Sequence, residues 1–407
     1  MCVQKEGCSA TYHKCTELSS FFQRIGFRLI AQYSILFTIH ECRLGMEDYR
    51  LHMKKYNYID LVKMITMFLV ILCHCLLFFS DNPYWVVNAD YESYGAKFLC
   101  NILNYSVVPV FVFSAGFLFQ VSMQHKESSI TDALIKRAKR LLLPYLLYGL
   151  LWLVPTYTLF DIPSYGRPEG SSLTDGYKSM FLGMFCDVAW FLLMLFWVSI
   201  IWIFLKSLLK RNRLIVGSVV AVALYFATHY LLAGISYYTL SQIDIYIVIF
   251  FMGASFFWIS DKTEKLSMPV LITISVVGIL ICAILAQYAP IYYWTLCVFE
   301  IVMPVVMVLL AMGLCKLKLQ TRIEDTRIYK WLLKHNMDIY LMQAPGMYLS
   351  FRLFYPLVGQ NCALCVILCY ILTIALDIFI VLVLSYIKEW IASAVRSSKK
   401  GKCLGEN

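Results

Sequence analysis

Long apolar stretches, each of the length of a membrane-spanning helix, recur along the 407 residues of the chain. A transmembrane helix needs about 20 predominantly apolar residues. The composition is 60% hydrophobic and 15% charged, whereas soluble chains average about 25% charged residues. An outer-membrane β-barrel is excluded because its strands are short and alternate in polarity. The sequence therefore predicts an all-α polytopic membrane protein with about ten transmembrane helices, over residues 59–80, 99–121, 141–160, 188–205, 214–232, 240–259, 268–288, 291–315, 336–355 and 362–387.

The distribution of basic residues predicts the orientation of these spans. If the segment before the first span is cytoplasmic, the cytoplasmic loops and the C-terminal tail carry 24 Lys and Arg residues, and the opposite loops carry 3. Cytoplasmic loops of membrane proteins are enriched in Lys and Arg. We therefore expect both termini in the cytoplasm. The net charge of +10 then marks a membrane face in contact with lipid and not a nucleic-acid partner.

The chain divides into three segments of different character. Residues 1–52 contain one apolar stretch, 27–39, that is too short to span a membrane. We expect them to be an N-terminal extension, which an over-long gene model explains because Met53 is a plausible bacterial start. Residues 53–388 form the predicted membrane domain, and residues 389–407 form a basic cytoplasmic tail.

The 15 cysteines are scattered and often lie inside apolar segments. This usage is typical of small packing residues and not of a disulfide framework. Cys362, Cys365 and Cys369 resemble an iron–sulfur triplet, but the spacing i, i+3, i+7 within an apolar helix favours helix packing. No metal site is predicted.

The first predicted span carries three ionisable residues: Asp60, Lys63 and His74. Eleven helical steps of about 100° bring His74 to within about 20° of Lys63, roughly 16 Å farther along the axis. Asp60 lies one turn before Lys63 and can pair with it. Charges in a membrane helix are costly and are therefore candidates for function. An anchoring ion pair and a packing histidine are the alternatives, but the common face and the proton-transfer capacity of imidazole favour a catalytic site.

Further charged residues occur within or near the spans. They need partners on other helices, which one sequence does not assign. Asp338 lies near the cytoplasmic end of its span, where an interfacial position is a sufficient explanation. These residues are Asp244, Glu300, Asp338, Arg352 and Asp377.

Several motifs in order resemble the membrane acyltransferase-3 family over about residues 56–390. The signature basic residue and histidine correspond to Lys63 and His74, separated by ten residues. The other matching segments are 108–119 (VPVFVFSAGFLF), 136–145 (KRAKRLLLPY), 189–192 (AWFL) and 337–341 (MDIYL). Three positions depart from the family pattern: Lys63 replaces an arginine, and Val188 and Gln343 replace histidines. A lysine retains the charge but lacks the two-pronged donor geometry of arginine, and a glutamine cannot move a proton.

The resemblance implies an inner-membrane enzyme, an acyltransferase that transfers groups other than aminoacyl groups. It implies transfer of an acyl group, usually acetyl, from acetyl-CoA or another acyl-CoA to a hydroxyl of an envelope carbohydrate. His74 is the expected general base, with Lys63 and Asp60 on the same face; an acyl-histidine relay is an open alternative. Arg137 and Arg140 are the expected donor-binding residues, because the phosphates of coenzyme A need cations. The alternative is that these two arginines only set the orientation of the spans in the membrane, which they do in either case.

Two other functions compete with this interpretation. Ten spans with intramembrane charges also fit an exporter of a saccharide or a lipid-linked saccharide. The sequence shows neither visible internal repeats nor paired broken helices, which disfavours such a transporter. A catalytically inactive acyltransferase-like protein is the third reading, favoured by the departures at Lys63 and Gln343.

Overall fold

Helices make up all the regular structure in the part of the chain that the computed structural model describes. The described residues are 56–81, 87–125, 129–163, 170–184, 187–232, 234–235, 237–288, 293–317 and 322–403. The predicted extension 1–52 lies outside them. Residues Tyr56–Ile378 form one compact unit, and the description below concerns that unit. In the other unit, the described residues continue the last helix to Cys403, so this helix extends into the predicted tail.

The helices follow the predicted spans closely. Their bounds are α3 Asn57–Leu77, α4 Tyr94–His125, α5 Ile130–Arg137, α6 Leu143–Tyr148, α7 Val154–Leu159, α8 Leu173–Phe181, α9 Trp190–Phe204, α10 Leu214–Leu232, α11 Asp244–Thr263, α12 Met268–Tyr288, α13 Tyr293–Cys315, α15 Arg327–Val358 and α16 Cys362–Cys403. The prediction of a span over 240–259 was wrong at its start. Residues Tyr237–Gln242 form a 3₁₀ turn with positive φ at Tyr238 and Thr239, so the helix starts at Asp244.

Eight helical segments of the described residues are long and apolar enough to cross a membrane. Helix α9 is apolar but has 15 residues. Helix α15 is long enough, but polar residues such as Lys330, Lys334 and Gln343 interrupt its apolar character. The polytopic all-α architecture is therefore confirmed, and the count of ten spans and the location of the termini stay predictions.

Two π-helical segments widen the third span. They are Ala138–Leu142 and Gly149–Leu153, and they join α5, α6 and α7 into one span over residues Ile130–Leu159. Pro144 and Pro155 follow these segments directly, at the starts of α6 and α7. A proline cannot donate to the carbonyl four residues earlier and clashes with it, so the helix widens before each proline. The first π segment contains Arg140 and directly follows Arg137.

Helices α4 and α11 pack against each other with their backbones in close approach. A Cβ atom on Gly116 would lie 2.0 Å from the Phe250 carbonyl oxygen, and one on Gly253 would lie 2.0 Å from the Phe113 carbonyl oxygen. Each glycine therefore faces the backbone of the opposite helix, and any side chain at these positions would force the helices apart.

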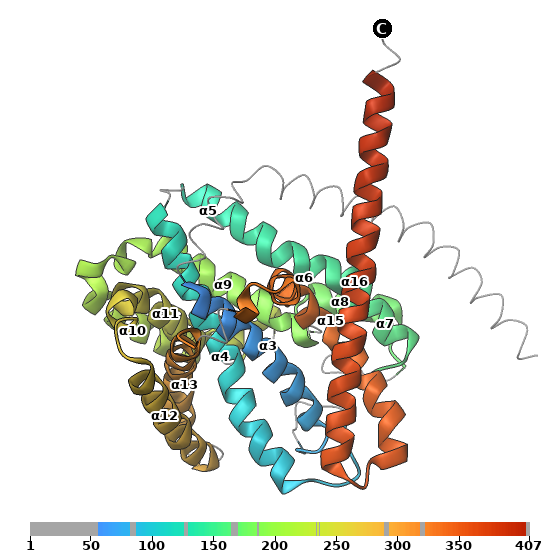
Figure 1. The fold of residues 1–407 in the computed structure, drawn as a ribbon, viewed down its shortest axis with the longest axis horizontal. Helices are drawn as coiled ribbons and strands as arrows, with labels where there is room; N and C mark the ends of the chain where they lie inside the picture. The colour runs from blue at the N-terminus through green and yellow to red at the C-terminus, as the bar shows by residue number, and fades with distance from the viewer. Residues whose placement is uncertain are drawn as a thin grey trace, which may run out of the picture. The chain divides into compact units, whose positions relative to one another are not determined.

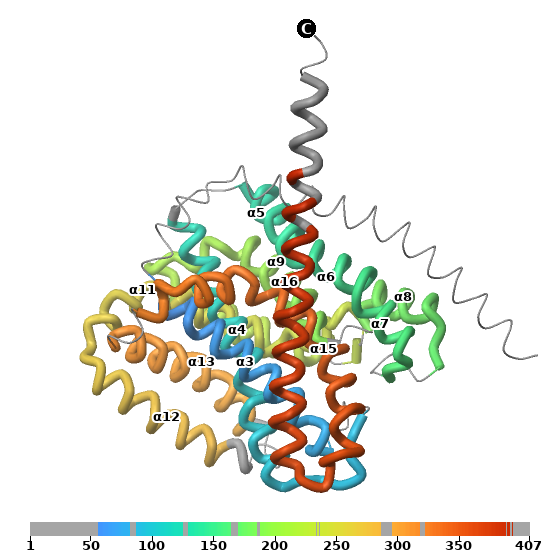
Figure 2. The backbone as a smooth tube through the Cα atoms, turned by 45° about the vertical axis from the view of Figure 1, so that its right-hand side comes forward, coloured from blue at the N-terminus to red at the C-terminus, as the bar shows by residue number. Residues whose placement is uncertain are grey.

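Helix α3 lies in the interior of this arrangement. It contacts α4, α13 and α15, and its position beside α4 is visible in Figure 2. Helices α12 and α13 lie side by side (Figure 1). More than half of the residues of α3 are buried, whereas Asp60, Lys63 and His74 are half-buried.

Candidate functional site

A cavity of about 220 Å³ lies among α3, α4, α9, α15 and the π-widened third span. Aromatic side chains from three of these helices are among its lining residues. The fourteen lining residues are Lys63, Phe111, Ala115, Leu118, Arg137, Arg140, Leu141, Phe191, Leu195, Leu333, Lys334, Asn336, Met337 and Tyr340. All fourteen are described residues, and none of them is acidic.

Four cationic side chains line this cavity: Lys63, Arg137, Arg140 and Lys334. Lys63, Arg137 and Arg140 were predicted as site residues on two separate spans, and the structure brings them to one cavity. Lys63 also binds Asp60, with Nζ and Oδ1 2.7 Å apart, which confirms the predicted pair. Asp60 does not line the cavity. Such a concentration of cations in a partly enclosed space favours a ligand with several negative charges.

Two further polar residues of the cavity were not predicted from the sequence. Lys334 was predicted to lie in a basic loop, but it lies on α15, as does Asn336. Among the described residues, no partner is found for Asn336 Oδ1, although this atom is buried. A buried oxygen without a partner at a cavity wall is available to a donor on a ligand.

Three aromatic side chains form a wall of the cavity: Phe111, Phe191 and Tyr340. The rings of Phe111 and Phe191 lie 6.0 Å and 5.9 Å from the ring of Tyr340, and 5.7 Å from each other. The Tyr340 hydroxyl donates to the Val188 carbonyl oxygen at 2.8 Å. This bond holds Tyr340 in place through a residue at which the chain departs from the acyltransferase-3 pattern.

His74 is not among the residues that line the cavity. Its Nδ1 is 3.4 Å from Oε1 of Gln343, and Gln343 lies one helical turn after Tyr340 on α15. Because an amide oxygen only accepts hydrogen bonds, Nδ1 carries the proton in this pair. The Nε2 atom of the imidazole is then unprotonated and can accept a proton. The arrangement therefore prepares His74 to act as a base. Its contact, Gln343, lies one turn of α15 from Tyr340, which lines the cavity.

A second histidine near the cavity has a carboxylate partner. His335 Nδ1 and Asp338 Oδ2 lie 2.9 Å apart, and the Tyr148 hydroxyl donates to Asp338 Oδ1 at 3.0 Å. The explanation of Asp338 as merely interfacial was therefore incomplete, because this residue joins α15 to α6. Sequence reasoning missed His335, although its spacing of three residues from Asp338 on a helix was a usable signal.

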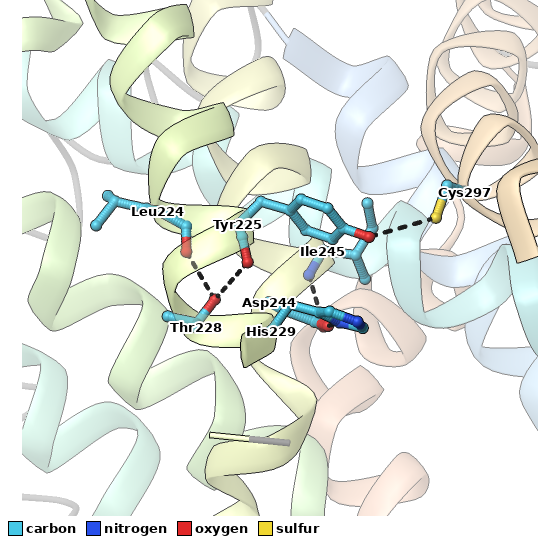
Figure 3. Close-up of polar contacts among 7 residues, drawn as sticks. All are labelled: Leu224, Tyr225, Thr228, His229, Asp244, Ile245 and Cys297. Carbon is cyan, nitrogen blue, oxygen red and sulfur yellow. Dashed lines mark hydrogen bonds and ion pairs between the residues drawn. The ribbon is translucent and has the colours of Figure 1, made fainter. Parts of the chain in front are cut away.

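Asp244 and Arg352, two of the other charged residues predicted within or near the spans, contact distant segments. His229 on α10 binds Asp244 on α11, with Nδ1 and Oδ2 2.9 Å apart (Figure 3). Asp244 lies near a second acidic residue, Glu300 on α13, which is 9% exposed, and the two acidic groups repel each other. The Arg352 guanidinium donates to the carbonyl oxygens of Phe160 and Asp161, just past the end of α7. These charges belong to helix ends and interfaces away from the cavity.

The chain was compared with known families and proteins. A family model described as Acyltransferase domain matches residues 56–387. Neither the comparison with curated proteins nor the comparison with solved structures finds a match.

Proposed function

The chain belongs to the acyltransferase family whose model spans residues 56–387, and we propose that it is a membrane O-acyltransferase acting on a cell-envelope carbohydrate. The donor is an acyl-CoA, with acetyl-CoA as the first candidate, and the acceptor is a carbohydrate hydroxyl. One observation carries the proposal. Tyr340 lines the cavity that holds four cations, and it lies one helical turn before Gln343, which contacts His74.

The positive charge of the cavity supports acyl-CoA as the donor. Coenzyme A carries several phosphate charges, and the guanidinium groups of Arg137 and Arg140 can bind phosphate oxygens with two donors each. Lys63 and Lys334 add charge from α3 and α15. Because Lys63 remains paired with Asp60, it supplies an oriented ammonium group and replaces the arginine of the family pattern by charge alone.

In the proposed reaction, His74 is the general base. His74 Nε2 takes the proton of the acceptor hydroxyl while the hydroxyl oxygen attacks the thioester carbonyl carbon. The carbon–sulfur bond then breaks, and the thiolate of coenzyme A takes the proton back from the imidazolium. Gln343 takes no proton in this scheme: it holds Nδ1–H of His74 so that Nε2 faces the reaction as the base.

The acyl chain has to reach His74 from the cavity. Lys63 and His74 are separated by eleven residues of α3, about 16 Å along the helix axis. Tyr340 of the aromatic wall precedes Gln343, the contact of His74, by one helical turn on α15. We therefore infer that the thioester arm passes this wall, from a donor site at the basic, cytoplasmic face of an inner-membrane protein.

The test compares the acyl content of purified envelope glycans by mass spectrometry. Cells express the wild type, His74→Ala, His229→Ala as the matched histidine control, or no protein. We expect an ester-sized mass increment with the wild type and with His229→Ala, and its loss with His74→Ala. An increment that survives His74→Ala would refute the base assignment. Equal glycans in all four strains, with the protein present in the membrane, would refute acyl transfer and favour export or inactivity.

A further inference from the structure

The segment of α15 that binds His74 is a weak point of the helix. Gln343 is followed by Ala344, Pro345 and Gly346 in the helix interior. Pro345 has no N–H group, so the carbonyl of Leu341 has no helical donor. Irregular backbone inside a membrane bundle is tolerated where it lines a site or is satisfied by another group.

Among the described residues, two buried side chains at this segment carry polar atoms without a hydrogen-bond partner. Asp377 on α16 and Gln343 are both 0% exposed. Among the described residues, neither carboxylate oxygen of Asp377 nor Nε2 of Gln343 has a hydrogen-bond partner. The two groups are complementary, because an amide nitrogen donates and a carboxylate accepts. A carboxylate inside a bilayer without a donor is strongly unfavourable, and such residues mark functional sites.

A small space adjoins the Asp377 carboxylate. A Cβ atom placed on Gly346 would lie 3.4 Å from Asp377 Oδ1, and 3.9 Å from the nearest carbon atoms of Thr373 and Leu376. These are ordinary contact distances, so a group of about the size of a methyl or hydroxyl fits there without a clash. Gly346 therefore leaves open a space that has a carboxylate on one side.

This space lies close to His74. Cys75, the next residue on α3, interacts electrostatically with Asp377. Gln343 contacts His74 through its oxygen, while its nitrogen lacks a partner one helical turn from Gly346. The base, the amide and the carboxylate thus come from α3, α15 and α16 and converge on the same break in α15.

We propose that Asp377 and Gln343 form the acceptor subsite, which binds one hydroxyl of a polyol and presents the neighbouring hydroxyl to His74. The anchoring hydroxyl donates to Asp377 and accepts from Gln343 Nε2. Gln343 thereby connects the two halves of the site, because its oxygen orients His74 and its nitrogen holds the acceptor. The acceptor class is a vicinal diol, as found in sugars, and not an isolated alcohol. This proposal rests on the proposed function for its reaction, but the binding site can be tested by itself.

The test uses the purified full-length chain in detergent micelles and two isomeric probes, 1,2-propanediol and 1,3-propanediol. The probes have the same composition and differ in the spacing of their hydroxyls, and the variants below report any difference between their non-specific effects on stability. The measurement is the thermal unfolding midpoint at increasing diol concentration. We expect the 1,2-isomer to raise the midpoint of the wild type more than the 1,3-isomer, because specific binding stabilises the folded state by mass action.

Three variants locate the effect. Gly346→Ala fills the space without a clash, and Asp377→Asn retains the size of the side chain while removing the carboxylate. Both are expected to abolish the difference between the isomers. Cys369→Ala is the matched control, since it changes a buried residue two turns earlier on α16, and it should keep the difference.

The results separate this inference from the proposed function. Equal shifts with both diols in the wild type, or a difference that survives Gly346→Ala, would overturn the subsite. A lower midpoint in both variants with unchanged isomer selectivity would mean that Asp377 holds a structural water, which also overturns it. If the selectivity depends on Asp377 while envelope glycans show no acylation, the subsite stands and the proposed reaction fails. If glycans are acylated but no variant changes the selectivity, the reaction stands and the subsite fails.

Discussion

Replacement of Arg137 by alanine should weaken donor binding without slowing the chemical step. Arg137 lines the cavity together with Lys63, Arg140 and Lys334, and its guanidinium lies 4.9 Å from the centre of the Phe119 ring. This stacking positions the guanidinium plane beside the cavity before a ligand binds. A phosphate bound there would therefore meet an oriented donor pair.

The magnitude follows from the kind of bond that is lost. A hydrogen bond to a charged group contributes about 1.5–3 kcal/mol, and about 1.4 kcal/mol corresponds to a factor of ten in affinity. We therefore expect Arg137→Ala to raise the dissociation constant of coenzyme A about 10- to 150-fold. Arg137→Lys should fall between wild type and alanine, because lysine retains the charge but loses the fork geometry. The turnover number should be unchanged, since this contact is made equally in the ground state and the transition state.

The assay is isothermal titration of coenzyme A into the purified protein, repeated at two salt concentrations. Arg213→Ala serves as the control, because Arg213 is an exposed basic residue of the same predicted membrane face and does not line the cavity. The difference between wild type and Arg137→Ala should narrow at high salt, where charge interactions are screened. An equal loss of affinity in Arg213→Ala, or an unchanged dissociation constant in Arg137→Ala, would refute a specific role of Arg137 in donor binding.

Three other predictions address the path to the base, the base itself and the helix crossing. Tyr340→Ala opens the aromatic wall and breaks the hydrogen bond to Val188, so it should increase acyl-CoA hydrolysis relative to transfer; an unchanged ratio of released coenzyme A to acylated product would refute the role of the wall. Gln343→Leu removes the acceptor of His74 Nδ1–H, a hydrogen bond worth about 0.5–1.5 kcal/mol. The turnover number should therefore fall roughly 2- to 12-fold, which single-turnover kinetics can check. Coenzyme A binding should stay unchanged, which titration can check. Gly116→Ala places a methyl group against the Phe250 carbonyl oxygen and should destabilise the fold by about 1–3 kcal/mol, as overpacking does; an unfolding midpoint equal to that of the wild type would contradict the close crossing of α4 and α11.

The helical spans, the family and the ion pair on the first helix could be predicted from sequence. Hydropathy is a local property, so each apolar stretch reports its own helix. The pairing of Asp60 with Lys63 depends only on the geometry of one helix, and the structure confirms it at 2.7 Å. Arg137 and Arg140 could be named because they lie in an ordered motif shared with a family. In each case the relevant information lies within one segment of the chain.

Contacts between segments were decided by the tertiary structure. Lys334 and Asn336 face the same cavity as Lys63 although about 270 residues separate them, and no local pattern marks that meeting. Gly116 belongs to the matching segment 108–119, and its close approach to the Phe250 backbone in the fold shows that it serves helix packing. The start of α11 was misplaced because the turn at Tyr238 and Thr239 adopts positive φ in residues that seldom do so.

Gln343 shows the difference most clearly. In the sequence it is a departure from a histidine and an argument for lost activity; in the fold its oxygen contacts His74 and its nitrogen lies one turn from the space beside Asp377. The amino-acid sequence by itself determined which segments are helices, where the membrane charges lie and to which family the chain belongs. Which of those charges share a cavity, and which buried groups are left without partners, was decided only when the helices packed, because contact depends on crossing geometry that no single segment encodes.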